Sequence, residues 1–397
     1  QTVTYGSPTL RFTHRTARVT IVLTDYTEGL ASVRLTGLST EGGNPAEITP
    51  YDKGSNTYTA LVAPQSVVAG TAFITCTFTN GKTFVYKMKN ATDWQAGGEY
   101  TYTVSLTAAK DPGYTIEGNG SYTVTSADGL MHVADLVNGG KTDINITLDT
   151  DIDLTGKDWT PIGTDYDNSY KGTFDGGGHT ITGLTFTTND EYAGLFGWLN
   201  RAGTVKNVVM EGVQITSNQI YGGSIGGVVG SSWGTIENCS VSGSISGTVY
   251  VGGVVGVQIG GSITGCSSSA TVKGTVDVGG VAGQTNSSAT LTACYATGNV
   301  TLEIAPKKNI AGGGLVGMNA GSSLLACYAT GNVTSTGSST GYVHIGGFLG
   351  NNYTTVTACY WKNNHEQGIG YNKESTEATE VDGSVVTWQK AVDAMNT

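Results

Sequence analysis

Two patterns of hydrophobic and polar positions divide the chain. In residues 1–108 apolar and polar residues alternate, as strands with one buried face require, and segments rich in Gly, Asn and Asp separate the alternating runs. Short strands at this spacing are typical of an antiparallel β-sandwich. We therefore expect such a sandwich over 1–108 and a linker over 109–119. The predicted strands are 18–24, 31–38, 57–64, 71–79, 82–88 and 100–107.

From residue 120 onward the pattern becomes a repeat. A Gly-rich phrase recurs, and the nine residues ACYATGNVT occur twice, at 293–301 and 326–334. A period of this length is typical of a stacked solenoid. At about 3.3 Å per strand residue, one repeat makes a coil of about three short strands. We predict a right-handed parallel β-helix over 120–397. The phrases are AGLFG, IGGVVG, VGGVVG, VGGVAG, GGGLVG and IGGFLG, and they end at Gly197, Gly230, Gly256, Gly283, Gly317 and Gly350.

Two helical segments bound the repeats. Ser126 is a plausible N-cap for a helix over 126–138, whose apolar face includes Leu130 and Val133. A helix at that place would cover the first open edge of the solenoid. A second apolar stripe over 386–396 predicts a C-terminal helix, which we expect to cover the far end.

One position in each repeat accepts either valine or cysteine. It stands 9 to 11 residues after the closing glycine of each repeat. Such a position behaves as a small hydrophobic slot, and no C-x-x-C pair supplies zinc-site spacing. We predict a buried ladder of free thiols rather than disulfides or a metal site. Its members are Val208, Cys239, Cys266, Cys294, Cys327 and Cys359.

Composition and charge exclude several classes of function. The 397 residues include 60 Gly, only 13% are charged, and the net charge is −11. A nucleic-acid or anionic-membrane partner would need clustered Lys and Arg, which the sequence lacks. No apolar run approaches the roughly 20 residues of a transmembrane helix. The chain opens directly on strand-like residues, as we expect of a processed, mature form.

The repeat phrases, together with DIDLTGKDWTPIG and GTFDGGGHTITGL ahead of them, resemble the GLUG motif of secreted and surface adhesin-like proteins. This resemblance covers about 120–370. The first domain resembles fimbrillin-like proteins of anaerobic Gram-negative bacteria in LRFTHRTARVTIVLT (10–24) and AGGEYTYTVSL (96–106). Both resemblances imply an exported protein of the cell surface or outer membrane. They imply fimbrial subunits and a host or bacterial surface glycan or protein as partners.

Aromatic residues are the candidate ligand contacts. Tyr295, Tyr328 and Tyr360 each follow a ladder cysteine, so we expect them to point outward once per coil, and Trp198 and Trp233 lie in turn regions. A row of exposed aromatic rings can stack on the faces of sugars. It can equally stabilise the edge of the coils as a stacking ladder. The sequence leaves both interpretations open.

Acidic residues give a second candidate. Asp149, Asp151 and Asp153 alternate along one strand and face one side, as in a calcium site, a carboxylate cluster or a polar edge. Calcium prefers six to eight oxygens, more than this row supplies. A lyase would need cations and a base, and a hydrolase two placed carboxylates; the repeats contain neither arrangement. No cofactor motif is present.

The sequence therefore predicts an exported, non-catalytic cell-surface adhesion protein, acting as an accessory or tip subunit of a fimbria. The alternative is a freestanding glycan-binding module. A polysaccharide lyase or hydrolase is a third hypothesis, for which the sequence offers little support.

Overall fold

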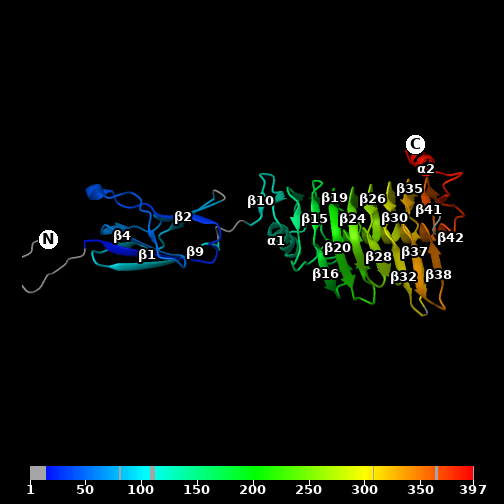
Figure 1. Cartoon of the computed structure of the whole chain (residues 1–397), viewed down its shortest axis with the longest axis horizontal. Coiled ribbons are helices and arrows are strands. Elements are labelled where there is room, and N and C mark those ends of the chain that lie inside the picture. The colour runs from blue at the N-terminus through cyan, green and yellow to red at the C-terminus, as the bar shows by residue number, and fades with distance from the viewer. Residues whose placement is uncertain (1–14, 80–81, 108–111, 307, 363–364, 397) are drawn as a thin grey trace, which may run out of the picture. The chain divides into compact units, whose positions relative to one another are not determined.

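The computed structural model describes residues 15–79, 82–107, 112–306, 308–362 and 365–396 (Figure 1). The chain divides into two compact units, Gln1–Asp111 and Pro112–Thr397. Each unit has its own hydrophobic core.

The N-terminal unit is β-sandwich-like, with a core made by the inward positions of its alternating strands. Ile21, Leu35, Phe73 and Trp94 are among the buried members of this core. Strand β1 pairs antiparallel with β4 but parallel with β9, so the expected all-antiparallel order is wrong for one pair. One sheet has the order β3 (Tyr51–Asp52), β4 (Thr57–Val62), β1 (Ala17–Thr24) and β9 (Glu99–Ser105), and another has β2 (Leu30–Leu35), β6 (Ala72–Phe78) and β7 (Thr83–Lys87). Strands β5 (Gln65–Val67) and β8 (Thr92–Trp94) form a separate pair, and Glu41–Gly43 is a 3-10 helix.

All six strands predicted for this unit are present, each with ends shifted by three residues or fewer. The segment 10–14, which contributes to the fimbrillin-like resemblance, lies outside the described residues.

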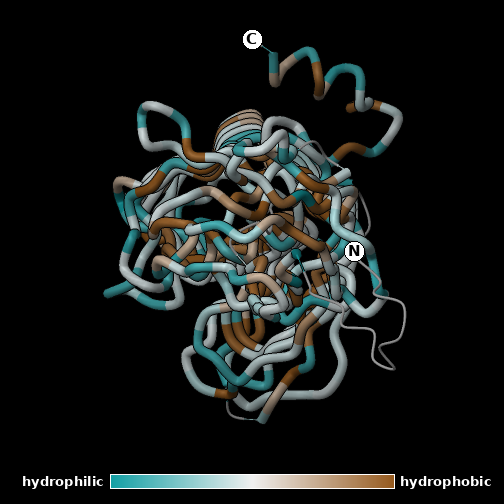
Figure 2. Tube along the Cα trace, turned by 90° about the vertical axis from the view of Figure 1, so that its left-hand side faces the viewer, coloured by the Kyte–Doolittle hydropathy of each residue, from teal (hydrophilic) through white to brown (hydrophobic). Residues whose placement is uncertain are grey.

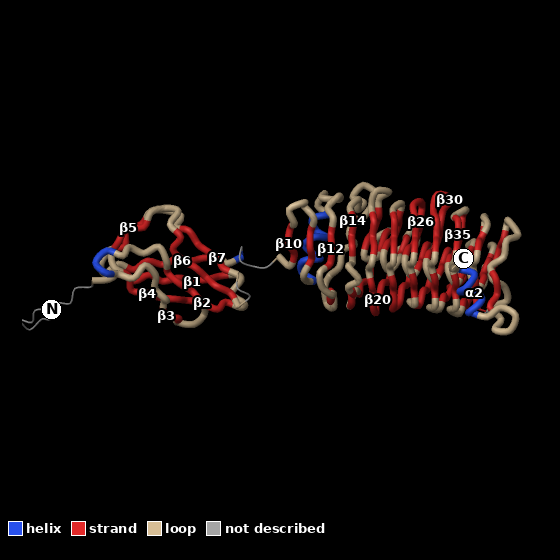
Figure 3. The backbone as a smooth tube through the Cα atoms, turned by 90° about the horizontal axis from the view of Figure 1, so that it is seen from above, coloured by secondary structure: helices blue, strands red, loops and turns tan. Residues whose placement is uncertain are grey.

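The second unit is a parallel β-solenoid whose coils each contribute strands to three long sheets (Figures 1 and 3). The first sheet begins with the antiparallel pair β10 (Tyr114–Ile116) and β11 (Tyr122–Val124). Residues 112–119, which we expect to be part of a linker, therefore belong to the solenoid unit. It continues through β12 (Ile146–Leu148), β14 (Thr173–Asp175), β19 (Thr204–Lys206), β23 (Thr235–Glu237), β26 (Val255–Thr264), β30 (Ala282–Thr292), β34 (Val316–Ala320), β39 (Leu349–Asn352) and β42 (Ile369–Asn372), with β18 (Phe196–Leu199), β22 (Val229–Ser232), β35 (Ser323–Leu325) and β40 (Val356–Thr357) alongside.

The other two sheets are built in the same way. The second sheet contains β13 (Ile152–Asp153), β15 (Thr180–Thr182), β20 (Val209–Ser217), β24 (Ser240–Ser246), β27 (Ser267–Ser268), β31 (Tyr295–Ala296), β36 (Tyr328–Ala329), β41 (Tyr360–Lys362) and β43 (Thr379–Val381), with β16 (Thr185–Thr188), β28 (Thr271–Gly274), β32 (Val300–Ile304) and β37 (Val333–Gly337) alongside. The third sheet contains β17 (Tyr192–Ala193), β21 (Ser224–Ile225), β25 (Tyr250–Gly252), β29 (Asp277–Gly279), β33 (Ile310–Gly313) and β38 (Val343–Gly346).

Register explains why the sequence repeats itself. The two ACYATGNVT copies are neighbouring rungs, because Tyr295 pairs with Tyr328 and Val300 with Val333. Equivalent positions in parallel, in-register coils meet each other, so the same residue suits each rung. Inward positions form one apolar cluster that runs from Tyr122 to Ala378.

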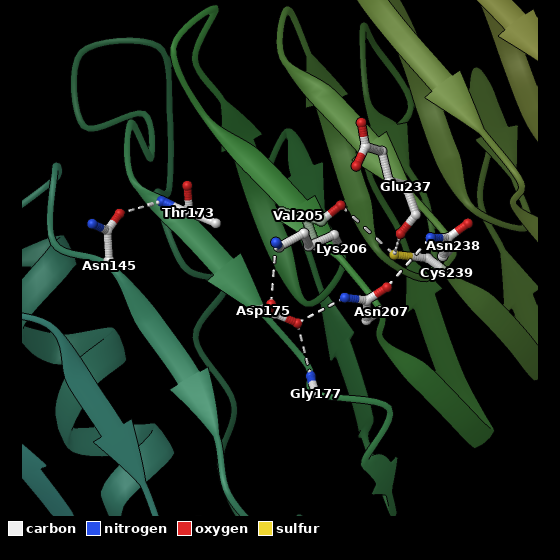
Figure 4. Close-up of polar contacts among 10 residues, drawn as sticks. All are labelled: Asn145, Thr173, Asp175, Gly177, Val205, Lys206, Asn207, Glu237, Asn238 and Cys239. Atoms are coloured by element: carbon white, nitrogen blue, oxygen red, sulfur yellow. Dashed lines mark hydrogen bonds and ion pairs between the residues drawn. The ribbon is translucent and has the colours of Figure 1, made fainter.

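A left-handed residue turns the chain between the first and second sheets, immediately before each ladder position. Asn207 and Asn238 have φ of 54° and 51°, and Figure 4 shows both beside Cys239. The Cys239 thiol donates to the Glu237 carbonyl oxygen at 3.2 Å. Val208 and all five ladder cysteines are buried, and the cysteines are free thiols. In later coils the left-handed residue is Gly265, Ala293, Ala326 and Ala358.

A second inward ladder is polar. The Asn319 amide nitrogen donates to the Asn352 side-chain oxygen at 2.9 Å, and Asn352 donates in turn to Asn372 at 3.1 Å. These buried amides satisfy each other from coil to coil, as buried polar groups require. They also explain the polar residues found inside the first sheet.

The two helices pack in different ways. Helix α1 (Ala127–Asn138) is capped by the Ser126 hydroxyl, which accepts from the Gly129 amide, and it buries Leu130 and Val133 in the solenoid core. Helix α2 (Trp388–Met395) packs its Ala391 against the outward face of the second sheet. It lies beside the last coils (Figures 2 and 3). The expectation that it covers the far end is wrong, because outward tyrosines offer its apolar stripe a surface on the flank.

Candidate functional site

The predicted tyrosine row exists, but α2 covers part of it. The rings of Tyr295 and Tyr328 stack with centroids 4.8 Å apart and planes 3° from parallel. Tyr328 also contacts Trp388 of α2, with centroids 5.6 Å apart. Tyr360 lies under α2 and is only 8% exposed. Tyr295, which is half-buried, therefore ends the stack and is the member farthest from α2 in the row.

A hollow of about 270 Å³ adjoins Tyr295. On the preceding coils the outward positions in register with Tyr295 are Ser267 and Ser240. These small side chains leave space beside the tyrosine, which Ser269 and Thr297 also line. The hollow thus combines hydroxyl groups, one aromatic residue and the carboxylate of Glu211, a combination that suits a neutral, polyhydroxylated ligand.

The two candidate tryptophans lie apart from this row. Trp233 is half-buried beneath the Arg201 guanidinium, whose carbon lies 5.0 Å from the ring centroid. Trp198 is 8% exposed and packs perpendicular to Tyr192, with centroids 4.6 Å apart. Its indole N–H has no hydrogen-bond partner among the residues that the structure describes.

The repeat-closing glycines stand where the first and third sheets meet, a place we call the glycine corner. A Cβ on Gly283 would lie 2.6 Å from the Val251 amide nitrogen, and one on Gly317 would lie 2.4 Å from that of Val278. No side chain fits at such distances from backbone. The close approach lets residues of the two sheets meet on the outside, as His344 Nδ1 and Asn351 Oδ1 do at 2.6 Å.

The aspartate row does not gather into a cluster. Asp151 accepts a hydrogen bond from the Thr180 amide at 2.9 Å, and Asp153 accepts one from the Thr155 amide at 2.9 Å. The Thr180 amide holds the pKa of Asp151 below its ordinary value, and the hydroxyl and the amide of Thr155 do the same for Asp153. Asp149, like the other two, is exposed. Within the described ranges, no three His, Cys, Asp or Glu residues form a group that could hold a metal ion.

Another carboxylate, Asp175, is tied to its neighbours in the same way (Figure 4). It accepts from the Asn207 amide group and the Gly177 backbone amide, both at 2.9 Å, and pairs with the Lys206 ammonium at 3.2 Å. Partial burial opposes ionisation, but these contacts together lower the pKa of Asp175. Asp175 therefore stabilises the turn made by the left-handed residue Asn207 in the first coils.

Asp277 is a candidate site residue that was not predicted from the sequence. The residue is only 7% exposed, although it occupies an outward position of the third sheet. The signal was available: Asp277 directly precedes the Gly-rich phrase of its coil, and the equivalent positions are Ser224, Tyr250, Ala311 and His344. An acid in that row is exceptional.

Comparison with known proteins identifies both halves of the chain. Residues 1–119 match the fimbrillin-like family model, and residues 221–246 and 247–273 each match the GLUG motif. The chain thus contains a fimbrillin-like domain followed by two GLUG motifs. The matched GLUG segments contain the glycine corners at Gly230 and Gly256.

Two curated relatives share part of this sequence. Halomucin of Haloquadratum walsbyi is 38% identical over 102 residues, which are 25% of this chain and 1% of that protein. A "Putative Gly-rich membrane protein" of Evansella cellulosilytica is 34% identical over 129 residues, 30% of this chain and 14% of the relative. The chain thus spans only a small part of the length of either. Within its described residues, no helix is long and apolar enough to cross a membrane.

A solved structure shares the fold. A "putative immunoglobulin A1 protease" from Bacteroides ovatus superimposes with a TM-score of 0.56 at 19% identity, over 70% of this chain and 88% of that one. At this identity the likeness concerns architecture alone. Fold is a weak guide to activity, which depends on the site.

Proposed function

We propose that this fimbrillin-like, GLUG-repeat chain is an exported adhesion protein of the cell surface that binds its target without catalysing a reaction. In this proposal the fimbrillin-like domain attaches to other surface components, as an accessory or tip subunit of a fimbria. The solenoid presents the ligand contacts. The fimbrillin-like and GLUG matches support the adhesin-like role.

The observation that carries the proposal is the arrangement beside Tyr295. Its ring and the serine hydroxyls around it border a shallow hollow on the solenoid flank. An aromatic ring next to hydroxyl groups can hold the apolar face of a sugar while bonding to its edges. Such a surface suits contact with an extended glycan.

The net charge of the protein affects which class of glycan it can bind. The chain has a net charge of −11, and its only arginine after Arg34 is Arg201. A polyanionic chain would be repelled by this charge and would find few guanidinium partners. We therefore expect neutral glycans to bind better than uronate-rich or sulfated ones.

The test is a glycan array probed with the full chain, run beside capture of surface proteins from the native cell. Tyr295→Ala should weaken glycan binding about 3- to 10-fold, the usual worth of an aromatic contact. Tyr51→Ala, at a 74% exposed tyrosine of the fimbrillin-like domain, is the control and should change nothing.

The glycan array and the capture experiment together distinguish the adhesin from the alternative functions. Capture of fimbrial or other surface subunits supports the adhesin, whereas strong glycan binding without any captured subunit favours a freestanding glycan-binding module. Cleavage of a polysaccharide, or of immunoglobulin A1, by the full chain would contradict the non-catalytic proposal.

A further inference from the structure

A second hollow of about 270 Å³ lies at the glycine corner, several coils from α1 and near the C-terminal end of the solenoid. It is bounded by outward residues of the third and first sheets and by residues of the loops that flank their strands. Those that matter most are Asp277, Asn309, Tyr342, His344, Asn351 and Tyr353. We call it the Asp277 pocket.

Its shape follows from two small residues. In the outward row of the third sheet, Ala311 lies between Asp277 and His344 in register. The methyl group of Ala311 leaves the space that a larger side chain would fill. Gly317 presses against the backbone of the preceding coil, where a Cβ would lie 2.8 Å from the Asp277 carbonyl carbon. Asp277, His344 and Asn351 therefore line the hollow from strands, whereas Asn309, Tyr342 and Tyr353 line it from the loops that flank those strands.

Asp277 differs from every other aspartate discussed above. It is only 7% exposed and lines the pocket, and burial is the sole influence on its pKa, with no hydrogen bond or ion pair from the described residues contributing. Burial raises the pKa of Asp277 to about 7. A buried carboxylate without a partner costs stability. Groups that cost stability while lining a cavity are characteristic of ligand sites.

Aromatic rings form one wall beside this carboxyl. His344 stacks between Tyr342 and Tyr371, with centroids 5.9 Å and 5.1 Å away and planes within 25° of parallel. The hydrogen bond from His344 to Asn351 fixes the imidazole orientation. Tyr342 is 71% exposed, so the wall remains accessible to a ligand.

We propose that the Asp277 pocket binds one neutral sugar residue of a glycan. The C–H face of the sugar packs on the tyrosine wall, its hydroxyls donate to the Asp277 carboxylate, and the amides of Asn309 and Asn351 bond to neighbouring hydroxyls. The inference rests on the adhesion function proposed above and adds a subsite to it, on a different face from Tyr295.

The side chains that line the Asp277 pocket favour a neutral sugar over an acidic or a cationic ligand. Among the described residues, no lysine or arginine lines the pocket, so an acidic sugar would place a second negative charge beside Asp277 without compensation. An alkylammonium group would match the carboxylate and the rings. The oxygens of the two amides already accept hydrogen bonds, from the Tyr342 backbone amide and from His344, so the amides present N–H donors that an ammonium group cannot use. A neutral sugar uses all three kinds of group.

The test measures affinity of the full chain for neutral oligosaccharides by titration calorimetry. The probes are mannotriose, lactose, N-acetyllactosamine and cellotriose. Asp277→Asn should weaken binding about tenfold or more, because a hydrogen bond to a charged acceptor is lost. Tyr342→Ala should weaken it several-fold. Tyr221→Ala is the matched control, because Tyr221 is 76% exposed in the corresponding loop of an earlier coil and should have no effect.

The outcomes separate this inference from the adhesion proposal. Glycan binding that depends on Tyr295 but not on Asp277 would overturn the pocket assignment and leave adhesion intact. Tighter binding of spermidine or of sialyllactose than of every neutral probe would also overturn it. Thermal unfolding of Asp277→Asn should show a folded protein at least as stable as the original, so lost binding there supports the inference.

Discussion

The left-handed residue before each ladder position is the sharpest constraint at the scale of single residues. Early coils use Asn and Gly there, which tolerate positive φ, whereas later coils use Ala293, Ala326 and Ala358 with φ between 48° and 55°. Alanine in this conformation is strained by about 1–2 kcal/mol. The later coils therefore store strain that the earlier coils avoid.

Relief of this strain gives the first prediction. Ala293→Gly and Ala326→Gly should each raise the free energy of unfolding by about 0.5–1 kcal/mol, because relief of strain exceeds the added chain entropy of glycine. Urea unfolding followed by circular dichroism measures the change. Ala296→Gly, at a buried extended position of β31, should instead destabilise by about 1 kcal/mol. Equal destabilisation at all three sites would contradict the explanation.

Asp277 gives a prediction about pH. Its pKa rises from 3.8 in the ordinary case to about 7 in the folded chain. Between about pH 4 and pH 7 the folded state holds a proton that the unfolded state has released. Its contribution to stability therefore falls as pH rises through this window and stays constant above it.

Asp277→Asn removes this titration while leaving His344 and Tyr250 in place. The variant should be more stable than the original at pH 8, by up to about 4 kcal/mol, and the advantage should shrink towards pH 4. Thermal unfolding of both proteins between pH 4 and pH 8 measures it. A difference that does not change with pH would show that the Asp277 carboxyl is not buried as described.

The sequence predicted some of these residues and not others. A position occupied by either Val or Cys is recognisable as an interior slot from a single sequence, and the structure places those residues inside. Asp277 was not recognised, because an outward position is normally solvated. Only the folded corner shows that Ala311, Gly317 and their neighbours leave this outward carboxyl enclosed.

At the scale of elements, the glycine corner is the structural reason for the repeat phrase. Gly317→Ala would place a methyl group 2.4 Å from the Val278 nitrogen and 2.7 Å from the Gly283 oxygen. Both contacts are with backbone that cannot move aside, so the variant should lose about 3 kcal/mol of stability. Gly118→Ala, where no heavy atom lies within 4 Å of the added carbon, should cost under about 0.5 kcal/mol. Equal costs at the two sites would contradict the close-approach argument.

The docking of α2 offers a second test at this scale. Ala391 is fully buried against Tyr360, whereas its neighbour Val392 is 43% exposed. Ala391→Asp should release α2 from the flank, because an unpaired charge would be buried there. Hydrogen exchange at β36, β41 and β43 should then become faster. Val392→Asp should leave exchange unchanged, and faster exchange in both variants would show that α2 does not pack through Ala391.

Elements were predictable where the signal is local. A cap, an apolar stripe and a following strand were enough to predict α1 and its partner. The stripe of α2 showed only that the helix packs on something. The surface on which it packs is formed by outward tyrosines of different coils. These tyrosines come together only through the register of the paired strands, which could not be derived from the sequence.

At the scale of the whole molecule, the chain joins two units with separate cores and separate resemblances. The fimbrillin-like domain is a β-sandwich-like body, and the GLUG solenoid carries both hollows, one beside Tyr295 and one at Asp277. This arrangement underlies the central claim, which is that the solenoid holds the ligand while the fimbrillin-like domain attaches the protein.

Hydrogen exchange of the full chain, with and without the best glycan from the array, tests this claim most directly. We expect slower exchange in the solenoid segments 276–285, 293–301 and 342–353 when glycan is bound, no change in β1, β4 and β9, and recovery of the glycan at its original length. Protection confined to the fimbrillin-like domain, or a shortened glycan, would contradict it.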